Sequence, residues 1–69
     1  MSAIENTSPK ILRLNDVKIQ TGLSRSAIYA LAKLDQFPKP INLSLRSVGW
    51  LENEINDWIK ERISLRVKA

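Results

Sequence analysis

The side chains best suited to chemistry in this 69-residue chain lie on one stretch, from Thr21 to Leu34. At about 100° per residue, a helix here would gather its cationic, hydroxyl and phenol groups on one side. That side is formed by Arg25, Ser26, Tyr29, Ala30 and Lys33. Such groups bind phosphates and base edges. The pattern favours a helix that binds a polyanion, although an ordinary solvated surface helix has a similar face.

The residues before this helix predict how it begins. Gly22 can adopt positive φ and so end a preceding helix. Ser24 is placed to cap the next one, and Leu23 and Ile28 have the spacing of a hydrophobic staple. The opposite side of the helix is apolar and is expected to face the core through Ala27, Ile28, Leu31, Ala32 and Leu34. We therefore predict the turn and second helix of a helix-turn-helix.

A short first helix is expected over residues 16–21. Asn15 is the predicted cap, and Asp16 suits the positive end of the helix dipole. Val17 should turn inward, and Leu14 and Ile19 have the spacing of a second staple. The stretch 11–14 before this helix is predicted to be a short strand or an extended entry.

Two prolines separate the second helix from a predicted β-hairpin. Asp35 can take the left-handed conformation that ends a helix, and Phe37 should anchor the following loop in the core. The alternation in 41–43 and the apolar run 48–50 then predict two strands. The tip would carry Arg46 between Ser44 and Ser47. Such a wing could hold DNA phosphates or enter a minor groove; a solvated hairpin is the plainer alternative.

The last helix is predicted over residues 52–63. Its apolar arc of Ile55, Trp58, Ile59 and Ile63 should close the core, with Trp50 packed beside it. Its outer arc includes Glu54, Asp57 and Glu61, which could bind a metal ion. Because a convex helix in so small a chain offers little cleft, we do not expect an enzyme.

Composition sets further limits. The net charge is +4. The stretch from Arg13 to Trp50 contains six cationic and two anionic residues, whereas anionic residues outnumber cationic ones from 51 to 63. A basic part suits nucleic acid. Without Cys or His, neither a disulfide framework nor a usual zinc site is expected. The chain has no long apolar run and no signal-peptide pattern. We expect a soluble intracellular protein with no cofactor, small-molecule ligand or membrane partner.

The ordered set of motifs between Arg13 and Arg62 resembles the AlpA family of small prophage-associated regulators, within the wider excisionase-like and MerR-like winged helix-turn-helix group. The resemblance is carried by Arg13-Leu14 with Val17, Thr21 to Ser26 before Ile28-Tyr29, Phe37 to Pro40 with Leu43, Arg46 to Trp50, and Glu54-Ile55 with Trp58-Ile59. Asp35 stands where the family often has Gly. Ala30 stands where it often has Arg, so base preferences do not transfer directly.

The resemblance implies a mostly α fold with three helices and a two-stranded wing. It implies a sequence-specific DNA-binding protein of a mobile element, which acts as a transcriptional regulator, an excisionase that directs recombination, or both. Double-stranded DNA is the expected partner, with integrase or further copies on adjacent sites. The location that the resemblance implies is the bacterial cytoplasm, at the nucleoid. A protein-only adaptor is the alternative.

Within this scheme we expect a disordered lead-in over 1–10, the winged domain over 11–63 and a basic tail over 64–69. The expected recognition-helix contacts are Ser24, Arg25, Ser26, Tyr29 and Lys33. The expected wing contacts are Lys39, Ser44, Arg46 and Ser47.

Overall fold

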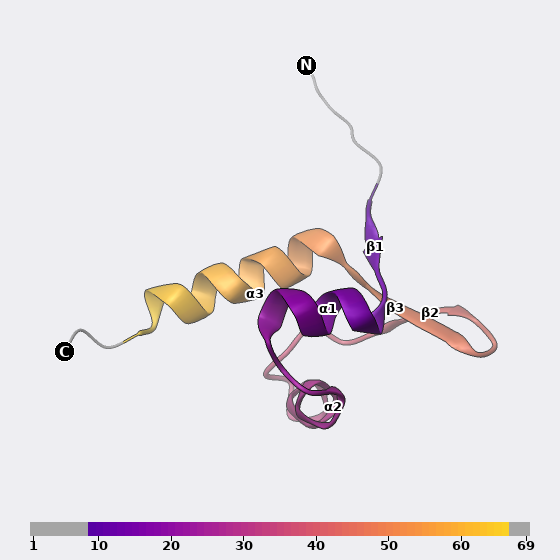
Figure 1. The fold of residues 1–69 in the computed structure, drawn as a ribbon, viewed down its shortest axis with the longest axis horizontal. Coiled ribbons are helices and arrows are strands. Elements are labelled where there is room, and N and C mark those ends of the chain that lie inside the picture. Colours follow the sequence, from indigo (N-terminus) through magenta and orange to yellow (C-terminus); the bar gives the residue numbers. More distant parts are fainter. Residues whose placement is uncertain (1–8, 67–69) are drawn as a thin grey trace, which may run out of the picture.

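A computed structural model describes residues 9–66 of the chain. Three helices and three strands follow one another, with a helix pair before the hairpin and one helix after it (Figure 1). Their order and bounds are β1 (Ile11–Leu12), α1 (Leu14–Thr21), α2 (Arg25–Lys33), β2 (Ile41–Ser44), β3 (Ser47–Leu51) and α3 (Glu52–Ser64). This arrangement confirms the predicted fold class of three helices with a two-stranded wing. We use "wing" for β2, β3 and the turn between them.

Helix α1 begins two residues earlier than predicted. Arg13 is its N-cap in extended conformation, and its backbone N–H donates to the Asp16 carboxylate at 3.3 Å. Asn15 is already helical, so its predicted capping role is wrong. The predicted staple is also wrong, because Ile19 is 80% exposed. Val17 is fully buried, as predicted.

The predicted turn into α2 is confirmed. Gly22 has a φ of 75°, and the N–H of Ala27 donates to the Ser24 hydroxyl at 3.2 Å. Asp35 takes the left-handed conformation with a φ of 60°. The prediction fails at Leu34, which is 64% exposed. The helix ends at Lys33, so the helical period no longer sets the direction of this side chain.

The loop between α2 and the wing is held by two indole groups. The Trp50 Nε1–H donates to the carbonyl oxygen of Pro38 at 3.0 Å, and the Trp58 Nε1–H donates to that of Gln36 at 2.8 Å. Phe37 between them is buried, as predicted, and packs edge-on against Trp58. The loop therefore fixes α2 relative to both the wing and α3.

Strand β3 is the centre of an antiparallel sheet with the order β1-β3-β2. Leu12 pairs with Trp50 and Ile41 pairs with Gly49, while the register shifts between Asn42 and Ser44. The entry segment whose form the sequence left open is thus a strand. Its pairing adds a third strand at the base of the wing.

The core lies between the helices and one face of the sheet. Its fully buried members are Trp50, Ile28, Ile55 and Val17. Trp50 lies in the same cluster as Ile55 of α3, which agrees with its predicted packing beside that helix. Ile63 does not complete the apolar arc, because it is 55% exposed where α3 extends beyond the rest of the chain (Figure 1).

The expected lead-in and the expected basic tail lie partly outside the residues that the structure describes. Residues 1–8 of the expected lead-in and 67–69 of the expected tail are not among the described residues. Lys10 is part of the fold, since its carbonyl oxygen accepts from the N–H of Glu52 at 2.8 Å. Ser64 belongs to α3 rather than to a tail. Within residues 9–66, no helix is long and apolar enough to cross a bilayer.

Candidate nucleic-acid interface

Three arginines from three separate segments meet at one shallow groove. The groove lies between the beginnings of α1 and α2 and the wing, and it is lined by Arg13, Leu14, Asn15, Arg25, Tyr29, Arg46 and Val48. We call this the arginine groove. It contains two of the predicted contact residues of α2 and the arginine predicted for the wing.

Arg13 is a member of this groove that the sequence-based site prediction did not include. Its Nε–H donates to the carbonyl oxygen of Val48 at 3.0 Å, while the residue remains exposed. This bond joins the start of α1 to β3. The sequence feature that could have indicated a role for Arg13 is its position as the one cation in the apolar stretch 11–14. An ordinary surface arginine would give the same pattern.

Arg25 is oriented by Tyr29. Its guanidinium carbon lies 5.5 Å from the centre of the Tyr29 ring, a cation–π arrangement. That ring in turn packs edge-on against the buried Trp50, with 6.0 Å between ring centres. Tyr29 is therefore half-buried rather than fully outward. The position of the Arg25 guanidinium therefore depends on the packing of Tyr29 against Trp50.

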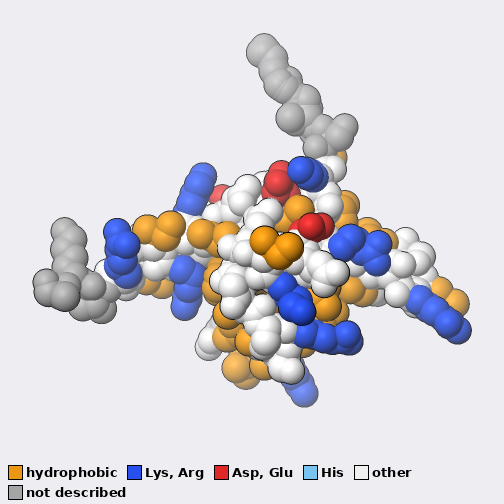
Figure 2. All heavy atoms as spheres, in the orientation of Figure 1, with side chains coloured by type: hydrophobic (Ala, Val, Ile, Leu, Met, Phe, Trp, Pro, Cys, Tyr) orange, Lys and Arg blue, Asp and Glu red, His pale blue; other side chains and the backbone are white. Residues whose placement is uncertain are grey.

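The N-terminus of α2 adds to the positive character of the groove, whereas the Asp16 carboxylate in the first turn of α1 offsets part of that of α1. Leu14 and Arg25 are the first residues of α1 and α2, and both line it. A helix carries partial positive charge at its N-terminus. The first turn of α2 contains no acidic residue. Lys and Arg side chains lie over α1, α2 and the tip of the wing in Figure 2, so the surface near the groove is suited to an anion.

The tip of the wing is a two-residue turn of Leu45 and Arg46, both exposed. Ser44 and Ser47 form the pair of strand residues that closes it. The predicted position of Arg46 between two serines is thus confirmed, and the tip projects away from the three helices (Figure 1).

The remaining predicted residues lie apart from the arginine groove. Lys33 and Lys39 line a second hollow with Tyr29, Ala32 and Pro40. Lys39 precedes the wing, and its Nζ lies 2.8 Å from an Asp35 carboxylate oxygen. Ser26 is exposed on the first turn of α2, and Ser24 is occupied in part by its capping bond. The predicted contacts thus lie on α2, the loop after it and the wing rather than in one cluster.

Comparison with known proteins gives the family. The family model described as prophage CP4-57 regulatory protein (AlpA) matches residues 10–63. This range includes α1, α2, the whole wing and all of α3 except its last residue. The chain belongs to the AlpA family. It is 40% identical over 62 residues to the DNA-binding transcriptional activator AlpA of Escherichia coli strain K12, covering 81% of this chain and 89% of that protein. It is 38% identical over 63 residues to the uncharacterized protein ORF88 of Enterobacteria phage P4, covering 91% and 72% respectively.

One departure from the AlpA pattern has a structural explanation. Asp35, where the family often has Gly, adopts the left-handed conformation that glycine takes easily. Its carboxylate also pairs with Lys39. Ala30 is exposed beside Tyr29, so the second departure changes a surface side chain.

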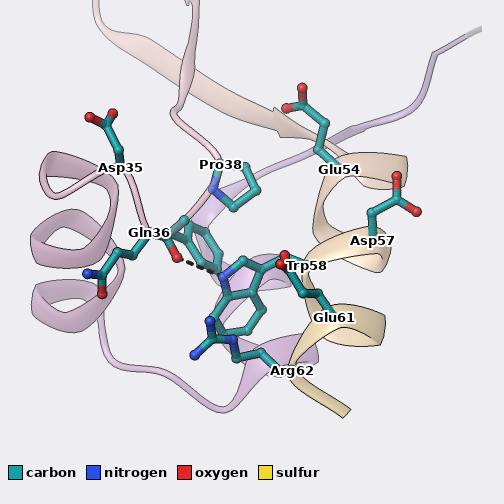
Figure 3. Close-up of a pocket in the computed structure, with 9 residues that line it drawn as sticks. Asp35, Gln36, Pro38, Glu54, Asp57, Trp58, Glu61 and Arg62 are labelled. Atoms are coloured by element: carbon teal, nitrogen blue, oxygen red, sulfur yellow. Dashed lines mark hydrogen bonds between the residues drawn. The ribbon is translucent and has the colours of Figure 1, made fainter. Parts of the chain in front are cut away.

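The acidic side of this AlpA-family chain lies around Trp58. Figure 3 shows Glu54, Asp57 and Glu61 along α3, with Asp35 across the hollow and the Arg62 guanidinium beside the Trp58 ring. In the part of the chain that the structure describes, no three carboxylates are arranged to hold a metal ion.

Proposed function

We propose that this protein binds double-stranded DNA in a sequence-specific manner and regulates genes of a prophage or related mobile element. The observation that carries the proposal is the meeting of Arg13, Arg25 and Arg46 at one groove. Guanidinium groups from three separate segments can follow a phosphate backbone that a single cation could only touch. The relative named as a DNA-binding transcriptional activator supports the same role.

In the proposed complex, α2 enters the major groove through its N-terminal end. Arg25 pairs with a guanine edge or with a phosphate, Ser24 and Ser26 bind nearby backbone or base atoms, and Tyr29 contacts a phosphate or a thymine methyl group. Lys33 binds a phosphate farther along the helix. A helix of nine residues reads few base pairs, so recognition requires further contacts.

The wing and its neighbours would supply those contacts. Arg46 binds the adjacent backbone or minor groove, with Ser44 and Ser47 beside it and Lys39 at the other end of α2. Arg13 joins this set as a phosphate contact. Its bond to Val48 links the start of α1 to the wing. A phosphate bound by Arg13 would therefore have a fixed position relative to α1 and to the wing.

Transcriptional regulation and excision would use the same interface. An excisionase binds near an attachment site and assists an integrase, whereas a regulator binds at a promoter. The protein would act in the bacterial cytoplasm on the nucleoid, with integrase or other copies of itself as further partners. The proposed activity includes no covalent step, and incubation of the protein with DNA and magnesium should leave the DNA intact.

The test is recovery of sheared host DNA by the purified protein, followed by sequencing. Enrichment at a promoter supports regulation, and enrichment of repeats beside a prophage attachment site supports excision. The Arg25→Ala/Arg46→Ala variant should lose the enrichment, whereas Lys60→Ala on α3 should retain it. Recovery no better than the input for the unmodified protein would overturn the proposal and favour a protein-only adaptor.

A further inference from the structure

The end of the wing carries a leucine that contributes nothing to the core. Leu45 is 98% exposed, the highest value among the exposed large hydrophobic residues of the described chain. It forms the two-residue turn together with Arg46. Single exposed leucines are common on proteins, so exposure alone assigns Leu45 no role. Its position is the informative feature, because the turn ends a projection that leads away from the three helices (Figure 1).

The residues of this turn are not those that a turn of its length favours. Two-residue hairpin turns prefer Asn-Gly, Asp-Gly or a leading glycine, which accept positive φ. Leu45 and Arg46 have negative φ, since Asp35 is the one non-glycine residue with positive φ among residues 9–66. The backbone therefore does not require leucine or arginine at the tip. What this pair provides is one apolar and one cationic side chain.

The charge around the tip favours DNA as the partner of both side chains. Arg46 is the only charged residue in the range 41–51, so no carboxylate on the wing repels a phosphate backbone. Arg46 also lines the arginine groove with Arg13 and Arg25. Cationic and apolar atoms lie side by side at the end of the wing in Figure 2. Because Leu45 is next to Arg46 in the same turn, the DNA groove that receives the arginine also receives the leucine.

We propose that Leu45 is a wedge that enters the minor groove of the bound DNA and partly unstacks one base step, an inference that rests on the proposed function. An apolar wedge of this kind slides between neighbouring base pairs and kinks the duplex toward the major groove. Arg46 binds the groove beside the wedge, because the negative potential of the minor groove attracts a guanidinium. The two consecutive residues of the turn thus supply both groups.

The size of the tip fits a gap between base pairs better than it fits a protein surface. A stable protein interface takes about 20–30 residues from each partner, whereas the turn offers two. A single apolar side chain can fill an unstacked base step. The base step is therefore the occupant that the tip favours.

This role makes Leu45 a specificity-determining residue that forms no hydrogen bond to a base. Unstacking costs least at pyrimidine–purine steps such as TA and CA/TG. Transfer of the leucine side chain out of water offsets part of that cost. The bond from Arg13 to Val48 holds the wing to the start of α1. Sites with a flexible step at a fixed separation from the bases contacted by α2 should therefore be bound more tightly.

Fluorescence of 2-aminopurine, a base analogue that brightens when its stacking is lost, tests the wedge directly. The analogue is placed at successive positions of the DNA that the purified protein enriches, and the full chain is added. One step under the wing should brighten. Energy transfer between dyes at the two ends of the duplex should report a bend of about 20° or more. Bound DNA that brightens at no position would overturn the proposal.

Three variants separate the wedge from its surroundings. Leu45→Ala should lose both signals while its affinity falls by less than about tenfold, because the arginine contacts remain. Leu45→Met should keep both signals, since methionine also serves as a wedge. Ile63→Ala removes an aliphatic side chain of α3 that is 55% exposed and should change neither signal. Equal signals from Leu45→Ala and the unmodified chain, both at saturating protein, would refute the wedge.

Replacement of the brightened step by a stiff A-tract step gives an independent test. The unmodified chain should bind the altered site about tenfold more weakly, a usual effect of one wrong base pair. Leu45→Ala should bind both sites nearly equally, and an equal loss for both proteins would show that Leu45 does not read the step.

Two further outcomes would assign the failure to its source. If Leu45→Ala loses only the cooperative binding of a second copy, with brightening and bend unchanged, Leu45 contacts protein and the wedge is wrong. Selective binding to DNA that stays straight and stacked likewise refutes only this inference. Failure of the unmodified chain to enrich any DNA refutes the proposed function itself.

Discussion

At the scale of single residues, Arg25 and Arg62 form a natural comparison. Each guanidinium carbon lies over an aromatic ring, 5.5 Å from the centre of Tyr29 and 5.4 Å from that of Trp58. They differ in their surroundings. Arg25 shares its groove with two other arginines, whereas Arg62 lies in a hollow with three carboxylates of α3. The same local contact thus has opposite electrostatic settings.

We predict that Arg25→Ala weakens DNA binding by about 1–3 kcal/mol if the guanidinium reads a guanine. Arg62→Ala should leave the affinity nearly unchanged. The measurement is a titration of fluorescent duplexes that carry the enriched sequence or a shuffled one. An equal loss on both duplexes would assign Arg25 to a phosphate and contradict the base-reading role.

At the scale of elements, the stability of the short helices depends on their capping residues and on the contacts that pack them against the rest of the chain. Helices α1 and α2 have 8 and 9 residues, lengths that are marginal without packing. Their caps, the left-handed Gly22 between them and the indole bonds to the following loop supply the necessary order. Two predictions concern these contacts.

The first concerns the cap of α2. Ser24→Ala removes the bond from the Ala27 N–H and should lower the free energy of unfolding by about 1 kcal/mol. Ser26→Ala, inside the same helix and exposed, should change it little. Urea unfolding without DNA, followed by circular dichroism, checks both. Equal effects of the two substitutions would show that the capping bond contributes nothing.

The second concerns the loop between α2 and the wing. Trp50→Phe removes the bond to Pro38 and part of a fully buried side chain, so it should cost about 2 kcal/mol of stability. Trp58→Phe, at a half-buried position, should cost less. The remaining tryptophan reports unfolding by fluorescence in each variant. A larger loss for Trp58→Phe would mean that the wing contact is the weaker support of the loop.

At the scale of the whole molecule, charges of opposite sign are divided between faces. The arginine groove lies on the side of the sheet that bears the helices, and the carboxylates gather around Trp58. Cationic and acidic side chains thus occupy different surfaces of one small chain.

Salt dependence tests this division as a whole. If the three groove arginines and Lys33 each neutralise a phosphate, the logarithm of the binding constant should fall with the logarithm of salt concentration with a slope of about −3.6. Arg46→Ala should reduce the magnitude of the slope by about 0.9, and Lys60→Ala should not change it. A slope near zero in fluorescence anisotropy titrations would contradict an interface built on phosphates.

The sequence alone determined the features that depend on local chemistry. Gly22, Ser24 and the prolines after Phe37 set where helices and turns occur, because caps and backbone conformations act over a few residues. The alternation in 41–43, the polar interruption after it and the apolar run 48–50 likewise identified the wing and placed Arg46 at its tip. The helical periodicity failed at Leu34 and Ile63, near helix ends where packing partners run out, and the staple predicted for Ile19 did not form.

Only the tertiary structure decided which distant residues meet. Arg13 reaches the site through a bond to a residue 35 positions later, and no local pattern encodes that distance. The three-stranded sheet likewise exists only because β1 pairs with the base of the wing. The sequence specified the groups that could contact DNA, but long-range pairing of strands and packing of Tyr29 on Trp50 determined the groove in which they lie.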